Sequence, residues 1–287
     1  MSPLRRAAGR HQPLTWAPSG ASEHDAYLHV RRLGENGPPV VLLHGLLASS
    51  RYWGRAFDVL AEDHRLVAPD LLGFGASPRP DHGYGPGEHA DAVARCLREL
   101  GLDDAPALVV GHSMGSIVAL HLAHRHPGLV ERVVAFAPPI YDSRADAIRH
   151  IRALGFMTRL FAFDTRLARR ACRWVCDHRE LTGRLATRLR GDLPASIARD
   201  GVQHTWASYS QSVEEVILSP TPPSILEQPH CPVHIVAGHA DTILDLPLLQ
   251  RLEQRRRITL DIWADAEHDL ILRQPGRCVE VLNGPRA

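Results

Sequence analysis

A serine with a glycine two residues away on either side offers the clearest chemistry in this chain. Residues 111–115 read Gly-His-Ser-Met-Gly, with Ser113 at the centre. A serine hydroxyl is a weak nucleophile at neutral pH, so it must be exposed, aimed and deprotonated by a neighbour. A sharp strand-to-helix turn, the nucleophile elbow, provides the exposure, and glycines at 111 and 115 remove Cβ atoms that would crowd it. The flanking runs 108–110 and 116–126 favour a strand and a helix. We therefore expect Ser113 to be a nucleophile; the alternative is a glycine-rich turn with a surface serine.

A serine nucleophile needs a histidine as base and a carboxylate that orients the histidine. His268 follows the apolar run 258–263, late in the chain, and is the candidate base. Because the chain contains 18 histidines, a surface histidine is the alternative. Asp241 follows the run 233–237 and is preferred to Asp245, which lies farther from the predicted strand end. The order Ser113, Asp241, His268 is one of the orders in which such triads occur.

The oxyanion that forms during acyl transfer needs two backbone N–H donors. One is the amide of Met114, which follows the nucleophile at the start of a predicted helix, where the helix dipole favours negative charge. The other is the amide of Leu46, in the loop after the run 40–43, where Gly45 lets the backbone turn toward the site. His44 either orients this loop or contacts the substrate, and a purely structural role is the alternative.

Strand-like and helix-like runs alternate along most of the chain, which predicts an α/β fold with a mostly parallel sheet. The continuous apolar run 40–43 is typical of a strand that is buried on both faces. Strands are predicted at 27–33, 40–43, 65–68, 108–110, 132–136, 233–237 and 258–263, and helices at 50–61, 87–100, 116–126, 247–256 and 275–282.

Residues 139–218 interrupt the alternation, because they contain no convincing buried strand. This segment is rich in arginine and aromatic residues, and we interpret it as a helical cap inserted into a core of residues 1–138 and 219–287. Trp174 and Trp206 are candidate substrate contacts within the cap. Its arginines can form a solvated helix face or hold a substrate carboxylate.

The composition narrows the range of partners and compartments. The formal net charge is +1, and nothing in it indicates a nucleic-acid partner. No secretory signal and no apolar run of membrane-spanning length is visible, so we expect a cytoplasmic protein without a membrane span. The first dozen residues are expected to form a loose tail. A homodimer is possible.

The cysteines and clustered histidines do not predict a metal site. The chain has five cysteines without a disulfide-like framework, which fits a reducing compartment. Cys172 and Cys176 are one helical turn apart, and we interpret them as core-filling residues. His121, His124 and His126 lie on one predicted helix and are expected to form a solvated face.

These spaced motifs together resemble the α/β-hydrolase superfamily, in its capped esterase, dehalogenase and C–C-hydrolase-like branch. The resemblance covers residue 27 to the C-terminus and rests on residues 40–45, 70–77, the elbow, 238–241 and His268. It implies an eight-stranded, mostly parallel sheet, a helical cap at 139–218, and chemistry without a cofactor. Serine at 113 is unlike the aspartate of dehalogenases and epoxide hydrolases. Glu267 stands where the family often has glycine.

The sequence therefore predicts a serine hydrolase that cleaves a small or medium, mostly apolar carboxylic ester, lactone or thioester through an acyl-enzyme. One alternative is a C–C bond hydrolase, or a lyase or cyclase of secondary metabolism, with the same triad. A second alternative is a non-enzymatic ligand-binding receptor on the same scaffold. The predicted partner is a small-molecule substrate.

Overall fold

The computed structural model of the chain describes residues 28–153 and 166–284. The predicted N-terminal tail and the first residue of the predicted strand 27–33 lie outside these ranges. Within the described residues, no helix is both long enough and apolar enough to cross a membrane.

A single sheet forms the centre of the molecule, and its strand order is β1-β3-β2-β4-β5-β6-β7. Strand β1 runs antiparallel to β3, with Val30 opposite Pro69, and the other neighbouring strands are parallel. The strands are β1 (Val30–Leu33), β2 (Pro39–Leu43), β3 (Arg65–Pro69), β4 (Ala107–His112), β5 (Val130–Phe136), β6 (Val233–Gly238) and β7 (Ile258–Trp263). The mostly parallel α/β architecture is confirmed.

The described residues form seven strands, one fewer than the family resemblance implied. Each of the seven β-leaning runs in the sequence forms a strand. The eighth strand was implied by the family resemblance alone, and no run in the sequence predicted where it would lie. The central strands β2 and β4 are buried along their whole length. Strands covered on both faces need apolar side chains on both faces, which explains their continuous apolar sequences.

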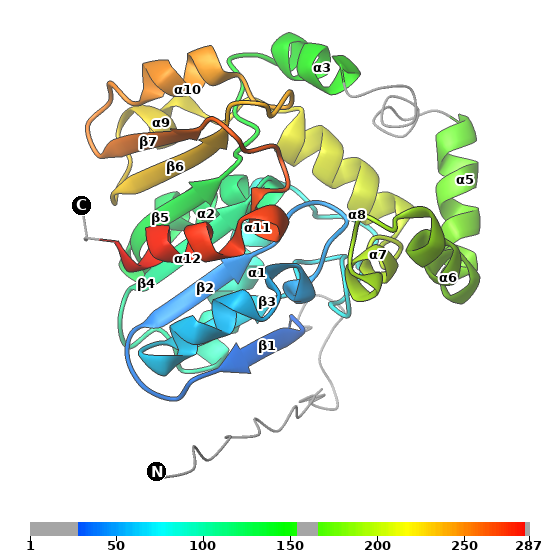
Figure 1. The fold of residues 1–287 in the computed structure, drawn as a ribbon, viewed down its shortest axis with the longest axis horizontal. Helices are drawn as coiled ribbons and strands as arrows, with labels where there is room; N and C mark the ends of the chain where they lie inside the picture. Colours follow the sequence, from blue (N-terminus) through cyan, green and yellow to red (C-terminus); the bar gives the residue numbers. More distant parts are fainter. Residues whose placement is uncertain (1–27, 154–165, 285–287) are drawn as a thin grey trace.

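Helices cover both faces of the sheet (Figure 1). Helices α1 (Pro86–Glu99) and α2 (Met114–Arg125) pack together on one face, and α2 also contacts β4 and β5. The short helix α11 (Leu270–Arg273), α12 (Pro275–Asn283) and the 3₁₀ helix η3 (Ala56–Glu62) pack together on the other face. Helix α10 (Leu246–Leu252) contacts the edge strand β7. The core therefore lies in two apolar layers, one on each side of the sheet.

The predicted helix 50–61 is instead two short 3₁₀ helices, η2 (Ser50–Trp53) and η3. Gly54 separates them with a φ of 60°, a left-handed backbone angle that interrupts the helical run. The hydroxyl of Ser49 accepts the Arg51 amide at the start of η2.

Every regular element that the structure describes between β5 and β6 is a helix. In Figure 1, α5, α6 and α7 lie to one side of the sheet, apart from the helices that cover it. The helices of this segment are α3 (Arg144–Ala153), α5 (Arg166–Asp177), α6 (Arg179–Leu189), α7 (Ala195–Asp200), α8 (Trp206–Gln211) and the π-helical turn η5 (Ser212–Ile217), followed by α9 (Pro223–Glu227). The turn η5 packs on α1 and α2, so the end of this segment already belongs to the helical layer of the core.

An ion pair with a buried carboxylate ties the helical segment to the core. Two nitrogens of the Arg51 guanidinium, Nε and Nη2, donate to the carboxylate of Asp200, at 2.9 and 2.6 Å. The Asp200 side chain is only 2% exposed, and the hydroxyl of Ser49 also donates to it. Because a buried carboxylate needs such donors, this contact fixes where α7 rests on η2.

Candidate active site

Ser113 occupies the turn between β4 and α2, in the geometry of a nucleophile elbow. Its φ of 52° and ψ of −121° are strained for a residue with a side chain. Its amide donates to the Phe136 carbonyl at 2.9 Å, which joins the elbow to β5. A Cβ at Gly111 would lie 2.3 Å from the Gly115 carbonyl oxygen, and a Cβ at Gly115 would lie 2.2 Å from the Leu43 carbonyl oxygen. The turn therefore requires both glycines.

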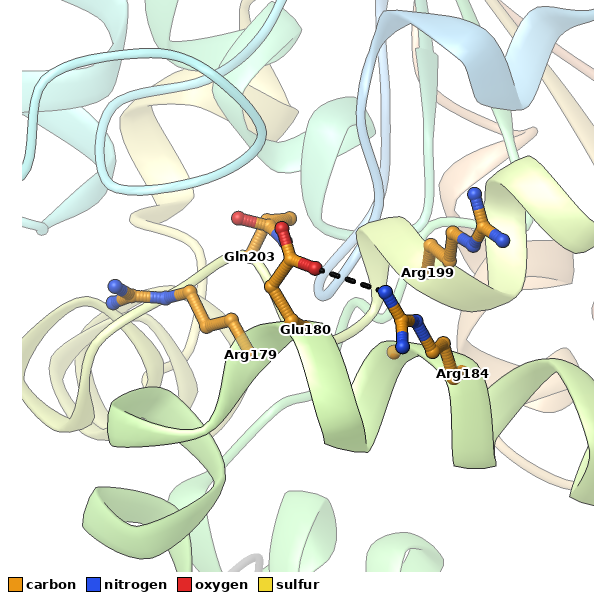
Figure 2. A pocket seen from close by; sticks show the side chains of 6 residues that line it. Arg179, Glu180, Arg184, Arg199 and Gln203 are labelled. Atoms are coloured by element: carbon orange, nitrogen blue, oxygen red, sulfur yellow. Dashed lines mark hydrogen bonds and ion pairs between the residues drawn. The ribbon is translucent and has the colours of Figure 1, made fainter.

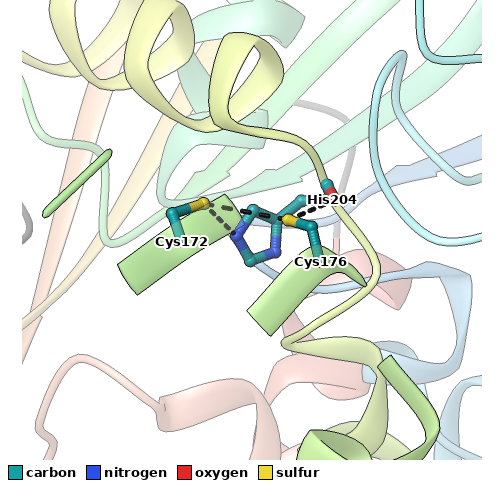
Figure 3. Close-up of side chains that lie close together, drawn as sticks. All are labelled: Cys172, Cys176 and His204. Carbon is teal, nitrogen blue, oxygen red and sulfur yellow. Dashed lines mark hydrogen bonds between the residues drawn. The ribbon is translucent and has the colours of Figure 1, made fainter. Parts of the chain in front are cut away.

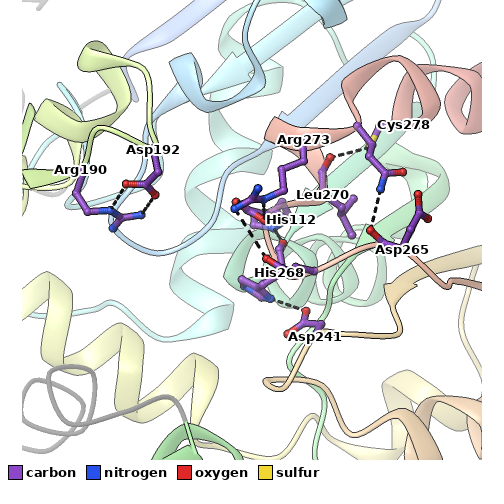
Figure 4. A network of polar contacts seen from close by, with 12 residues as sticks. His112, Arg190, Asp192, Asp241, Asp265, His268, Leu270, Arg273 and Cys278 are labelled. Carbon is purple, nitrogen blue, oxygen red and sulfur yellow. Dashed lines mark hydrogen bonds and ion pairs between the residues drawn. The ribbon is translucent and has the colours of Figure 1, made fainter.

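The structure brings Ser113, His268 and Asp241 into one hydrogen-bonded chain, although 155 residues separate the serine from the histidine. Nε2 of His268 lies 3.0 Å from the Ser113 hydroxyl, and Nδ1 lies 2.7 Å from Oδ2 of Asp241. Figure 4 shows His268 pointing at Asp241. Since a carboxylate can only accept, Nδ1 carries the proton and Nε2 is free to accept one from the serine. This is the arrangement that a general base requires.

The structure separates the two candidate carboxylates, Asp241 and Asp245, by their hydrogen bonds. The Asp241 side chain is 1% exposed, and its second oxygen accepts the Ile243 amide at 2.9 Å. Asp245 instead caps α10 by accepting the Leu248 amide at 3.0 Å. Asp241 is therefore placed to orient His268, and Asp245 begins a helix.

The carboxylates on either side of His268 in the sequence pair with an arginine. Nε of Arg273 donates to both oxygens of Asp269 at 2.8 Å, and its guanidinium also lies 3.8 Å from Glu267. The carboxylates of Glu267 and Asp269 therefore both lie near the guanidinium of Arg273, which is on α11 at the end of the same loop.

His112, the residue before the nucleophile, is a positioning residue that the sequence analysis did not assign. Its Nε2 donates to the backbone carbonyl of His268 at 2.8 Å, and its ring stacks on Tyr52 at 4.9 Å. Burial lowers the pKa of His112 to about 3, with a further contribution from His268, so the ring is neutral at working pH. The signal in the sequence that could have identified His112 is its place inside the elbow motif, directly before the nucleophile.

His44 fixes the loop that carries Leu46. Its ring is fully buried; Nδ1 donates to the Gly45 carbonyl and Nε2 accepts the Leu71 amide, each at 2.8 Å. Burial lowers the pKa of His44, and the charge of Asp70 partly opposes the shift. Both ring nitrogens are bonded to backbone groups, which favours the loop-orienting role of His44 over the predicted substrate contact.

The two predicted oxyanion donors belong to backbone segments next to the serine. Met114 is the first residue of α2, directly after Ser113. A Cβ at Gly45 would lie 3.2 Å from the Cβ of Ser113, so the backbone that leads into Leu46 passes beside the nucleophile. Asp70 accepts hydrogen bonds from the amides of Ser50 and Ala76, which holds the loop 70–77 in place after β3.

The two predicted tryptophan contacts differ in environment. Trp206 begins α8, lies 6.0 Å from the Tyr209 ring and packs partly against the core, with the Arg169 guanidinium over its ring. Trp174 stacks on His178 and remains 49% exposed. Such exposure is typical of a surface residue, and the predicted substrate contact of Trp174 stays a prediction.

Several arginines of the helical segment surround a cavity of about 390 Å³ between α6 and α7 (Figure 2). Its lining includes Arg179, Arg184 and Arg199, together with Glu180, which pairs with Arg184 at 3.4 Å. A different group, Cys172, Cys176 and His204, has the ligand types and spacing that could hold a metal ion.

Comparison with protein families gives a match to the alpha/beta hydrolase fold over residues 38–179. The esterase RhEst1 from a Rhodococcus species superposes with a TM-score of 0.64 at 25% identity, covering 88% of this chain and 92% of that one. The chain belongs to the α/β-hydrolase superfamily. The superfamily includes the serine-type esterases that the sequence motifs resembled.

Curated relatives of this α/β-hydrolase include proteins named for lipid esters. The probable lysophospholipase BODYGUARD 4 of Arabidopsis thaliana is 28% identical over 257 residues, covering 83% of this chain and 61% of the plant protein. Lipase LipV of Mycobacterium tuberculosis is 40% identical over 114 residues, covering 39% of this chain and 42% of the lipase. The chain thus matches less than two thirds of the length of each.

Proposed function

We propose that this α/β-hydrolase is a serine carboxylesterase that works through an acyl-enzyme intermediate. The observation that carries the proposal is the chain of hydrogen bonds from Ser113 through His268 to Asp241, at 3.0 and 2.7 Å. The family membership and the names of the lipase and lysophospholipase relatives support an ester as substrate.

In the first half of the reaction, the Ser113 oxygen attacks the ester carbonyl while Nε2 of His268 takes the hydroxyl proton. Asp241 holds the ring in the correct tautomer and stabilises the imidazolium that forms. The imidazolium then returns its proton to the alkoxide leaving group, and the acyl group remains on Ser113.

The negative charge on the tetrahedral intermediate needs donors that are already in place. The amides of Met114 and Leu46 fill this role, and the N-terminus of α2 adds its dipole. Loss of one such donor typically costs about 3–4 kcal/mol of transition-state stabilisation. In the second half, His268 removes a proton from water, which attacks the acyl-enzyme and releases the carboxylic acid.

The helical segment 139–218 is proposed to act as a cap that selects the substrate, over the core 1–138 and 219–287. Trp206 is its candidate substrate contact. Because the cap carries many apolar and aromatic side chains, we propose a small or medium, mostly apolar acyl ester, lactone or thioester.

A fluorophosphonate probe and a series of p-nitrophenyl esters test the proposal. We expect stoichiometric labelling of the wild type, hydrolysis of short- and medium-chain esters, and loss of both in Ser113→Ala. The exposed Ser224→Ala is the matched control and should behave as the wild type. Unchanged turnover by Ser113→Ala would overturn the proposal.

The same experiment addresses the two alternatives. Inert esters together with turnover of a vinylogous diketone by wild type, but not by Ser113→Ala, would indicate C–C bond cleavage. Tight ligand binding without turnover, unchanged in His268→Ala, would indicate a receptor. His239→Ala, at an exposed histidine, controls for loss of a histidine.

A further inference from the structure

Two cysteines and a histidine converge inside the helical segment, apart from the triad residues. Cys172 and Cys176 lie one turn apart on α5, and His204 precedes α8 (Figure 3). The two sulfurs are 3.8 Å apart, and Nε2 of His204 is 3.4 Å from the sulfur of Cys172. Cys172 and His204 are buried, and Cys176 is partly buried. From the sequence alone, Cys172 and Cys176 were interpreted as core filling, and His204 was not connected with them.

The spacing of these atoms matches the edges of a tetrahedral zinc site. With Zn–S bonds of about 2.3 Å and a Zn–N bond of about 2.0 Å, a tetrahedron places two sulfurs about 3.8 Å apart and sulfur and nitrogen about 3.5 Å apart. The measured separations of 3.8 and 3.4 Å agree with both edges. All three ligand atoms lie within 4.8 Å of one another, so one ion can reach them all with small side-chain rotations.

The hydrogen bonds around the cluster also suit a metal. The Cys176 thiol donates to the His204 carbonyl at 3.1 Å, and Arg179 donates to the same carbonyl at 2.9 Å. When the thiol loses its proton to a metal, that carbonyl therefore keeps a partner.

We propose that Cys172, Cys176 and His204 form a zinc site with three protein ligands, with water in the fourth position. Thiolate and imidazole are the donors that zinc prefers, and oxygen-seeking cations such as Mg²⁺ are disfavoured by the same set. A disulfide between the cysteines would need the sulfurs to approach to about 2.05 Å and would leave the His204 ring without its sulfur partner.

The zinc site would join two parts of the helical segment that are distant in the sequence. Zinc would clamp α5 to the turn before α8, which begins with Trp206. The helices of this segment pack on one another and make few contacts with the sheet. A metal ion would therefore stabilise their arrangement, as a hydrophobic core does elsewhere in the molecule. We expect the ion to stabilise the fold rather than to take part in ester cleavage.

Cobalt substitution of the untagged chain of 287 residues tests the proposal. The protein is reduced, stripped with a chelator and titrated with Co²⁺, and then with Zn²⁺ as competitor. We expect one equivalent of Co²⁺ to produce the near-ultraviolet band of thiolate-to-cobalt charge transfer, and one equivalent of Zn²⁺ to abolish it. At a free zinc concentration of 100 times Kd, the melting temperature should rise by about 5 °C.

Matched variants assign the ligands. Cys172→Ala/Cys176→Ala should lose the cobalt band entirely, and Cys231→Ala, at a buried cysteine outside the cluster, should keep it. His204→Ala should weaken zinc binding by about 100-fold or more, because even loss of an outer hydrogen-bond partner costs 10- to 100-fold. His178→Ala, at an exposed histidine next to α5, should leave the affinity unchanged.

Three outcomes would overturn the zinc site. The first is no charge-transfer band in reduced wild type, and the second is full zinc binding by the double cysteine variant. The third is stoichiometric Cys172–Cys176 disulfide formation with peroxide in a protein that binds neither Co²⁺ nor Zn²⁺. That reaction converts two thiols and one peroxide into a disulfide and two waters, and it would identify a thiol switch instead.

Discussion

The sheet around Ser113 and the helical segment between β5 and β6 are held together in different ways. Strands β2 and β4 are buried along their whole length, and the polar groups beside them, such as His44 and Asp70, bond to backbone amides. The helical segment exposes large apolar side chains instead, with Leu167 63% and Leu189 73% exposed. Many of its arginines form exposed pairs with carboxylates, which contribute about 0–1 kcal/mol each.

This contrast indicates that the sheet and the helical segment have different roles. The sheet holds the candidate catalytic atoms at fixed distances, because each loop that carries one is bonded to the next. The helical segment has fewer fixed contacts, so its packing can change without disturbing the triad. We therefore expect substitutions near the sheet to affect chemistry and folding strongly, and comparable substitutions in the helical segment to have small effects.

The largest expected effect comes from Asp241, compared with its neighbour Asp245. Asp241→Asn should lower kcat by about 10⁴-fold, because an amide no longer holds His268 in the tautomer that accepts the serine proton. Asp245→Asn should leave kcat nearly unchanged, because Asp245 only caps α10. Steady-state hydrolysis of a p-nitrophenyl ester measures both. Equal losses in the two variants would contradict the assignment.

A pair of glycine substitutions tests the difference in packing. Gly115→Ala places a methyl group 2.2 Å from the Leu43 carbonyl oxygen and 2.6 Å from that of His44, so we expect a loss of about 3 kcal/mol or more in stability. Gly191→Ala, in the helical segment, meets no heavy atom within 4 Å and should change stability by less than about 1 kcal/mol. Urea unfolding measures both, and a similar loss in the two would remove the contrast.

Buried neutral histidines should make the folded state sensitive to acid. Burial lowers the pKa of His89 and of His112 to about 3, so below pH 6.5 the unfolded chain binds protons that the folded chain excludes. The free energy of unfolding should therefore fall as pH drops from 6.5, by up to about 1.4 kcal/mol per pH unit for each group. Urea unfolding at pH 7, 6 and 5 measures the slope.

His89→Gln provides the control for this pH dependence. It removes one titrating group in the core, so the slope of stability against pH below 6.5 should flatten by about 1.4 kcal/mol per pH unit. An unchanged slope in this variant would show that other groups cause the acid sensitivity.

The smallest expected effects concern two arginines at the helical segment. Arg51→Ala leaves the buried Asp200 carboxylate without its cation, and we expect a loss of about 1–2 kcal/mol. Arg144→Ala breaks an exposed pair with Glu214 and should change stability by less than about 0.5 kcal/mol. Thermal unfolding measures both. Equal effects would mean that the Arg51 contact does not anchor α7.

The sequence predicted the elements around the elbow well, because local pattern and packing agree there. The run 87–100 became α1 over Pro86–Glu99, and the apolar runs became strands. The helix predicted at 50–61 was wrong because Gly54 adopts a left-handed φ angle. The presence of one glycine in a sequence rarely predicts such an angle. The elbow serine could be found from its two glycines, whose close approach to other backbone atoms leaves no room for a side chain.

Features that depend on packing between distant segments could not be predicted. Asp241 and Asp245 are both acidic and lie four residues apart, and only the fold shows which one meets His268. The contact of His204 with Cys172 depends on how α5 rests against the turn before α8. The eighth strand came from the family resemblance rather than from any run in this sequence.

The backbone of Ser113 has a consequence for engineering. Its left-handed φ of 52° is one that glycine adopts freely and serine resists, at about 1–3 kcal/mol for such strain. Ser113→Gly would therefore relax the turn while removing the proposed nucleophile. Stability and activity oppose each other at this position, so a directed-evolution screen that rewards only heat resistance would select against the serine.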